Sequence, residues 1–273
     1  MKSTQMLAVL LGTVVMSVSN VAAAAPMQVL LDENFEAVTG ITSATALRTI
    51  ADINTNNPSQ LNGSPAPSFA NTGNGNASAD AFNVRRSDNA IDGTAGTPTL
   101  GNTTFDNFFI GTANRFMVIG DNSGNLGGNP NGGTNASASS TMSIRFALEP
   151  IALVSPFDLD IFFDYVFDAD NTSNSDDFIA ELIFADSSKL SLLNLAAPSA
   201  VTRGTFNTVI ASSALTSAPA FLSFQLKEYT GNGSSAVGLD NIFVSATPIP
   251  EPGTWVLLGT GLLGLGRIRR MLS

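Results

Sequence analysis

The sequence of 273 residues contains neither cysteine nor histidine. Without cysteine there are no disulfide bonds, so the free energy of folding has to come from a buried core or from a bound metal ion. Without histidine, nucleophiles activated in a Ser-His-Asp or Cys-His arrangement are excluded, and so are zinc sites with histidine ligands. These absences remove most common hydrolase mechanisms and favour a protein that is not an enzyme.

Basic residues are also scarce, with 12 Lys and Arg against 22 Asp and Glu. Four of the basic residues and one of the acidic residues lie near the two ends of the chain, which leaves residues 25–250 with a formal charge of −13. Binding to nucleic acid or to anionic membrane surfaces needs a basic surface that this segment lacks. Nucleic acid is therefore excluded as a partner, whereas cations and neutral glycans remain.

The first 26 residues have the layout of a secretory signal peptide. One basic residue, Lys2, precedes an apolar stretch over residues 6–18 and a small-residue region over residues 22–25. Cleavage after Ala25 would leave a proline at the new N-terminus, where it tends to block signal peptidase. We therefore predict that signal peptidase removes residues 1–24, the alternative being an N-terminal membrane anchor.

The last 27 residues, 247–273, contain three blocks of different chemistry. These blocks are the triplet Pro250, Glu251 and Pro252, an uncharged run over residues 253–266, and the basic cluster Arg267, Arg269 and Arg270. A helix of 14 residues rises roughly 21 Å, which is short for a hydrocarbon core of about 30 Å. Trp255 and the arginines can extend its reach to the two interfaces, so we predict a short transmembrane helix with its basic end in the cytoplasm. A buried C-terminal helix is the alternative.

This order of blocks resembles the PEP-CTERM sorting signal of Gram-negative bacteria that make extracellular polysaccharide. The resemblance implies that an exosortase, an inner-membrane protease-transpeptidase, recognises the Pro-Glu-Pro triplet and removes the tail. It also implies transient anchoring in the inner membrane, followed by release to the cell surface or to the exopolysaccharide matrix of a biofilm.

Between the two ends, alternation of apolar and polar residues predicts antiparallel strands. The clearest strand is FDLDIFFDYVFD, residues 157–168, in which apolar residues at every second position alternate largely with aspartates. About nine such segments, without a long amphipathic helix, predict an all-β fold, an antiparallel two-sheet β-sandwich of jelly-roll type over residues 25–246. The polar segments 52–104 and 120–140 are predicted to be long surface loops.

Acidic residues occur near both ends of the predicted sandwich, in LLDENFEAVTG (30–40) and in VGLDNIFVSA (237–246). This pair of motifs resembles the jelly-roll carbohydrate-binding and galactose-binding-like domains, in which such residues surround a structural calcium ion. The resemblance implies Glu33, Glu36 and Asp240 as Ca²⁺ ligands, with Asp32 and Asn241 as weaker candidates. Solvated acids at strand ends are the alternative.

Tyr229 is the one candidate platform for a glycan. Sugar binding usually needs exposed aromatic rings, but the chain has two tyrosines and one tryptophan, and Trp255 lies in the tail. Tyr165 falls on the predicted core face of its strand, whereas Tyr229 lies beside a turn. This scarcity weakens the prediction of a lectin.

Together these patterns predict an exported, non-enzymatic envelope or exopolysaccharide-matrix protein with a structural or glycan-associated role. The alternatives are a calcium-stabilised carbohydrate-binding module, an adhesin, and a carboxylate-dependent glycoside hydrolase. The hydrolase would use Asp158 and Asp160, which lie on the exposed face of one strand about 7 Å apart. However, no apolar pocket is evident that would raise the pKa of either carboxyl.

Overall fold

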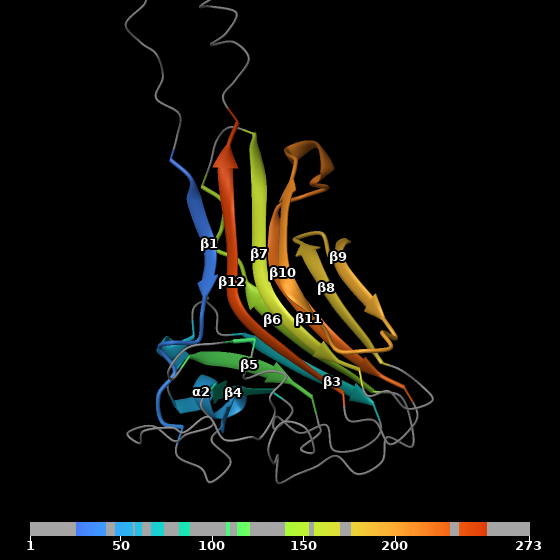
Figure 1. The fold of residues 1–273 in the computed structure, drawn as a ribbon. Coiled ribbons are helices and arrows are strands. Elements are labelled where there is room, and N and C mark those ends of the chain that lie inside the picture. The colour runs from blue at the N-terminus through green and yellow to red at the C-terminus, as the bar shows by residue number, and fades with distance from the viewer. Residues whose placement is uncertain are drawn as a thin grey trace, which may run out of the picture.

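The computed structural model describes residues 26–41, 47–56, 58–61, 67–73, 82–87, 108–109, 114–120, 140–152, 156–169, 176–229 and 235–249. These residues form two antiparallel sheets (Figure 1), so the predicted two-sheet β-sandwich is confirmed. Several predicted features lie outside the described residues. They are the signal peptide, the Pro-Glu-Pro triplet, the C-terminal hydrophobic helix and the arginine cluster.

The first sheet, called sheet A, is organised around the last strand of the sandwich. Its strands are β1 (Gln28–Glu33), β2 (Leu47–Thr49), β4 (Phe82–Arg86), β5 (Arg115–Ile119), β7 (Phe157–Asp168), β10 (Thr202–Ile210) and β12 (Ala236–Pro248). The order is β10-β7-β12-β5-β4-β2, and β1 also pairs with β12. Strand β12 pairs with β7 along one side and, on the other, first with β5 and then with β1.

The second sheet, sheet B, has the order β3-β6-β11-β8-β9. Its strands are β3 (Ser68–Gly73), β6 (Ser140–Ala147), β8 (Asp177–Phe184), β9 (Lys189–Ala196) and β11 (Pro219–Glu228). The helical elements are α2 (Ile50–Asn56) and the 3₁₀ turns η1 (Pro58–Gln60) and η3 (Ser212–Ala214). None of the helices in the described part of the chain has the length and apolar character needed to cross a membrane.

Phenylalanine side chains fill the space between the sheets. The ring of Phe163 from β7 packs edge-on against Phe224 of sheet B, with 5.0 Å between centroids, and stacks on Phe206 of β10 at 4.8 Å. Phe178 and Phe146 are also fully buried. Each such side chain contributes roughly 1.5–3 kcal/mol when it leaves water, so the core can stabilise the fold without disulfide bonds.

The prediction of one long loop over residues 52–104 was wrong for strands β3 and β4. Strand β3 contains one large apolar residue, Phe69, and it joins the sheet as an edge strand through its pairing with β6. Strand β4 is short, and all five of its residues are buried, including Asn83 and Arg85. Neither segment therefore has the apolar alternation on which the prediction relied. Of the second predicted loop, only Gly120 and Ser140 are described.

The first and last described residues lie at the same end of the sandwich (Figure 1). Gln28 of β1 opposes Ala246 of β12, and the backbone N–H of Ile249 donates a hydrogen bond to the carbonyl oxygen of Pro156 at 2.8 Å. The segments that precede residue 26 and follow residue 249 are thus attached to one end of the molecule.

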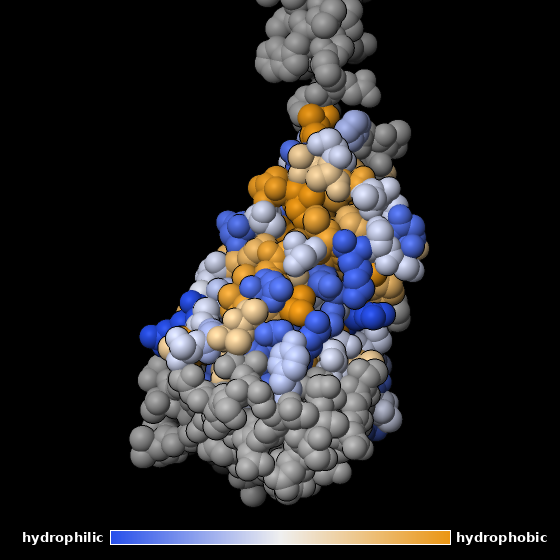
Figure 2. Space-filling model, turned by 90° about the vertical axis from the view of Figure 1, so that its right-hand side faces the viewer, coloured by the Kyte–Doolittle hydropathy of each residue, from blue (hydrophilic) through white to orange (hydrophobic). Residues whose placement is uncertain are grey.

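The side of the sandwich between β9 and β10 is open, because each of these strands is the edge of its sheet. Figure 2 shows hydrophobic residues gathered on the upper part of this side. Core-facing residues such as Leu190, Leu195 and Phe206 are only partly buried, and the neighbouring Val209 on β10 is 60 % exposed. The core is consequently less well covered here than between the central strands.

Candidate functional site

A β-bulge in strand β12 decides which side chains reach the outer face of sheet A. Asp240 opposes Asp164 and Phe243 opposes Phe162, so three steps along β12 match two steps along β7. Asn241, in the bulge, has a φ of 51°, in the left-handed region that asparagine tolerates better than most residues. Beyond the bulge, Ile242 is fully buried whereas Phe243 is only half-buried and points outward, as Phe162 does.

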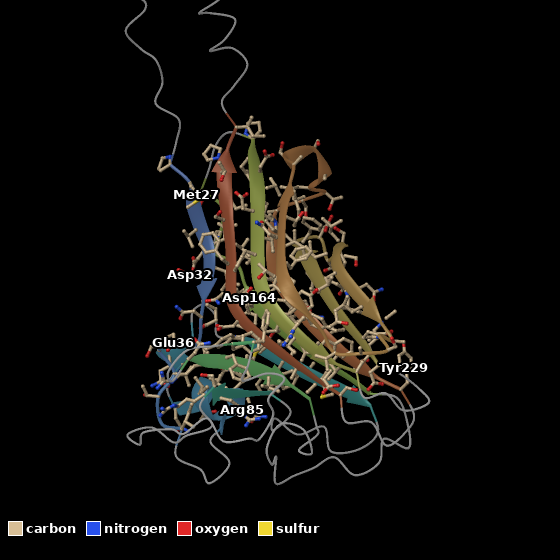
Figure 3. All side chains as sticks on the ribbon, in the orientation of Figure 1. Met27, Asp32, Glu36, Arg85, Asp164 and Tyr229 are labelled. Carbon is tan, nitrogen blue, oxygen red and sulfur yellow. The ribbon has the colours of Figure 1, made fainter. Side chains whose placement is uncertain are left out.

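Four residues on adjacent strands consequently form one row across the outer face. Asp32 of β1 opposes Phe243, and Phe162 of β7 opposes Asn207 of β10. Because Phe243 and Phe162 also oppose each other, two aromatic side chains stand between an acid and an amide. The row lies in an open groove of about 480 Å³ lined by Asp32, Asn34, Asp160, Ile161, Phe162, Asn207, Asn241 and Phe243. Figure 3 labels Asp32 and Asp164 on this sheet.

Hydrogen bonds within the protein hold several polar groups of the groove in place. The hydroxyl of Thr247 donates to Oδ2 of Asp160 at 2.9 Å. The side-chain amide of Asn241 donates to Oδ2 of Asp164, also at 2.9 Å, and Oδ1 of Asn34 accepts a bond from the backbone N–H of Glu36. The groove therefore presents carboxylate and amide groups in fixed positions beside two aromatic rings.

Asp240 opposes Asp164 on the outer face of sheet A, but it is buried and does not line the groove. Its side chain is 2 % exposed; Oδ1 accepts from the backbone N–H of Asn241 at 2.8 Å and Oδ2 from the side-chain amide of Asn114 at 3.0 Å. Burial raises the pKa of Asp240 to about 7 against the effect of these hydrogen bonds, and the charges of Asp164 and Glu36 act in the same direction as burial. Asp240 therefore holds the backbone of the bulge through its hydrogen bond with the N–H of Asn241.

The carboxylates predicted to bind calcium accept hydrogen bonds from the protein itself. Oε1 of Glu33 accepts from the backbone N–H of Phe35 at 2.7 Å. Glu36 accepts from the backbone N–H of Arg115 at 3.0 Å and pairs with its guanidinium at 3.4 Å. Together with Asp240, these residues do not form a group of three acids that could hold a metal ion, nor do any other described residues. Calcium binding therefore stays a prediction, to be tested by thermal melts with Ca²⁺ and with EDTA.

Tyr229, the predicted glycan platform, lies away from the groove (Figure 3). Its ring is 41 % exposed, and its hydroxyl donates to Oδ2 of Asp177 at 2.8 Å. The aromatic residues of the groove are Phe162 and Phe243, which the sequence reading missed. Phe162 could have been found, because it occupies an outward position among the aspartates of β7.

The two carboxylates of the predicted hydrolase are not brought into one pocket. Both side chains belong to the exposed face of β7, as predicted. Asp160 lines the groove, whereas Oδ1 of Asp158 accepts a hydrogen bond from the backbone N–H of Ser212 at 3.2 Å, outside it. The geometry of this pair is therefore suited to hydrogen bonding and provides no enclosed acid.

The end of the chain carries a recognised sorting signal. Residues 248–270 match the PEP-CTERM protein-sorting motif. The motif indicates that the protein is exported, that the tail is a membrane-anchored sorting signal, and that an exosortase processes it. Because the match begins at Pro248, the last residue of β12, the signal follows the sandwich directly.

Several solved structures are similar to the chain at low levels of identity. The Stig cyclase Fisc from Fischerella sp. TAU is 12 % identical, with 84 % of this chain and 100 % of that chain covered and a TM-score of 0.41. A family 16 carbohydrate-binding module is 14 % identical, with coverages of 50 % and 78 % and a TM-score of 0.26. A carbohydrate-binding module of the β-sandwich superfamily is 9 % identical, with coverages of 78 % and 60 % and a TM-score of 0.32.

A search of curated proteins gave no match to this sequence. These three structures have TM-scores below 0.5, so they carry no argument about function. The function has to be inferred from the sorting signal and from the groove.

Proposed function

We propose that this protein is a non-enzymatic, glycan-binding component of the cell envelope or exopolysaccharide matrix, and that the groove on sheet A is its binding site. The observation that carries the proposal is the row of Asp32, Phe243, Phe162 and Asn207 across four strands. A sugar ring presents C–H groups on its faces and hydroxyl groups around its rim. Phenyl rings can pack against the C–H faces of the sugar, and carboxylates and amides can form hydrogen bonds with its hydroxyl groups.

The position of the row on a sheet favours binding without a large entropic cost. Phe162 and Phe243 belong to β7 and β12, which pair over nearly the whole length of both strands. Their backbones are thus fixed before a ligand arrives, and less conformational entropy is lost on binding.

A binding role is better supported than a hydrolase role. General acid catalysis in a glycosidase needs a carboxyl with a raised pKa within reach of the glycosidic oxygen. Asp240 has a raised pKa, but it is buried outside the groove, and its two oxygen atoms accept hydrogen bonds from Asn241 and Asn114. An adhesin would use the same groove for a glycan on another surface.

The proposal predicts that Phe162→Ala and Phe243→Ala weaken binding to polysaccharide. Affinity electrophoresis measures how strongly the purified protein is retained by immobilised polysaccharides from a bacterium that makes extracellular polysaccharide. This retention should fall at least tenfold in either variant. Tenfold corresponds to about 1.4 kcal/mol, close to the value expected for one aromatic contact. Because both side chains are only half-buried, the melting temperature should change little compared with the loss of binding.

Tyr229→Ala is the matched control, because it removes an exposed aromatic ring that lies outside the groove. Its retention should equal that of the wild type. Unchanged retention of both phenylalanine variants, or retention that depends on Tyr229 alone, would show that the groove is not the binding site.

A further inference from the structure

Among the described residues that line the groove, two are acidic and none is basic. Asp32 and Asp160 are the charged residues of its lining. Asp164 and Asp158 belong to the same outer face of β7 and add further negative charge. The nearby base Arg115 forms a salt bridge with Glu36 at 3.4 Å. Arg203 of β10 lies four residues from Asn207, roughly 13 Å along the strand.

The two acids flank the aromatic pair on different strands. Asp32 opposes Phe243 from β1, whereas Asp160 opposes Ser245, the next outward residue of β12. From β1 to β10 the row crosses three interstrand spacings, or about 14 Å. That length suits an oligosaccharide better than a single sugar, and a chain lying over both rings would pass close to both carboxylates.

We propose that Asp32 and Asp160 make the groove selective for uncharged glycan chains and exclude chains that carry carboxylate or sulfate groups. The proposal rests on the proposed function, since it concerns the ligand of the same site. Hydroxyl groups of a neutral sugar can donate hydrogen bonds to both carboxylates. An acidic sugar in the same position would instead place like charges beside each other, and the described lining of the groove includes no basic residue. The two aspartates thus act as specificity-determining residues.

The test compares ligands that differ only in charge. The full-length protein, in mild detergent, is titrated with each ligand by isothermal calorimetry. The neutral ligands are hexasaccharides of β-1,4-glucan, β-1,3-glucan, β-mannan and α-1,6-glucan. The acidic ligands are the same chains oxidised to carboxylates at C6 wherever that carbon is free. We expect at least one neutral hexasaccharide to bind, and its oxidised form to bind at least tenfold more weakly. In the double variant Asp32→Asn, Asp160→Asn, the difference should shrink to less than threefold.

Asp186→Asn is the control, since Asp186 is an exposed aspartate in the turn between β8 and β9 of the other sheet. It should leave the ratio of the two affinities unchanged. Equal binding of neutral and oxidised chains, or a ratio that persists in the double variant, would overturn the selectivity while leaving the glycan-binding function in place. Absence of binding by every hexasaccharide would overturn both proposals.

Discussion

Among single residues, Asp240 has the most unusual environment in the described part of the sandwich. Its carboxyl is buried between the bulge of β12 and the side chain of Asn114, which in turn donates a hydrogen bond to the carbonyl oxygen of Phe109. A buried charge is costly, and for this reason the pKa of Asp240 rises from 3.8 to about 7. The folded state therefore binds a proton at Asp240 that the unfolded state has already released at neutral pH.

The raised pKa predicts that the protein loses stability as the pH increases. The contribution of Asp240 is most favourable below about pH 4 and declines until the pH has passed the folded-state pKa of about 7. Between pH 5 and pH 8, the free energy of unfolding of the wild type should fall by about 2–3 kcal/mol relative to that of Asp240→Asn. Urea denaturation at the two pH values measures this difference.

Asp186→Asn again serves as a control for this measurement. Hydrogen bonds from Ser188 lower the pKa of Asp186, so its titration lies below pH 4 and outside the range compared. This variant should follow the pH dependence of the wild type. If Asp240→Asn also follows the wild type between pH 5 and pH 8, the buried carboxyl does not titrate near neutrality.

At the level of elements, the bulge in β12 is the feature on which the groove depends. Before the bulge, Val237 and Leu239 point into the core; after it, Ile242, Val244 and Ala246 do so. Without the extra residue, Phe243 would point inward and the outer face would lose one of its two aromatic rings. The conformation of Asn241 in the bulge therefore decides whether Phe243 lines the groove.

Substitutions at Asn241 should separate the backbone requirement from the side-chain contribution. Asn241→Gly keeps the left-handed conformation accessible but removes the side chain that lines the groove and donates the hydrogen bond to Asp164. Asn241→Val places a β-branched residue at a φ of 51° and should destabilise the protein by about 1–2 kcal/mol more than glycine does. Thermal melts give the stabilities, and glycan retention should be weaker in the valine variant than in the glycine variant. Equal behaviour of the two would mean that the bulge imposes no such requirement.

Elements with clear alternation were predictable from the sequence, and those held by their neighbours were not. Strand β7 was recognised from Phe157 to Phe167, because apolar residues occupy every second position and aspartates occupy four of the six alternate positions up to Asp168. Strand β3 was not predicted, because backbone pairing can hold an edge strand that has few apolar side chains. Strand β4 was not predicted because Arg85 is buried, whereas its charge led us to expect an exposed loop residue.

The candidate site was predictable only in fragments. The outward position of Phe162 follows from the alternation within its own strand, but that of Phe243 depends on a register shift relative to β7. Asp32 and Asn207 come from strands that lie three positions apart in the sheet, and they are 175 residues apart in the sequence. These residues lie in one row because of the register in which the strands pair, and this register cannot be read from any single segment of the sequence.

At the scale of the whole molecule, the last strand is also a central one. Strand β12 pairs with β7, β5 and β1, so it carries ladder hydrogen bonds on both edges and supplies five of the fully buried core side chains: Val237, Leu239, Ile242, Val244 and Ala246. The sorting motif begins where this strand ends. The boundary between the folded domain and the signal is therefore sharp.

Two truncations should differ accordingly. A chain that ends at residue 249 keeps every described strand, and its β-sheet circular dichroism and melting temperature should match those of the processed protein. A chain that ends at residue 235 lacks β12 and should show no cooperative unfolding transition, because sheet A is then split into separate parts. A cooperative melt of the shorter chain would contradict the central role assigned to β12.

The late position of β12 also bears on the timing of folding. Strands β1, β5 and β7 are made before their common partner, and they cannot complete sheet A until the final part of the domain has followed them across the membrane. The sorting motif follows β12 directly. We therefore expect sheet A of an exported chain to be completed at the stage when the sorting tail reaches the membrane.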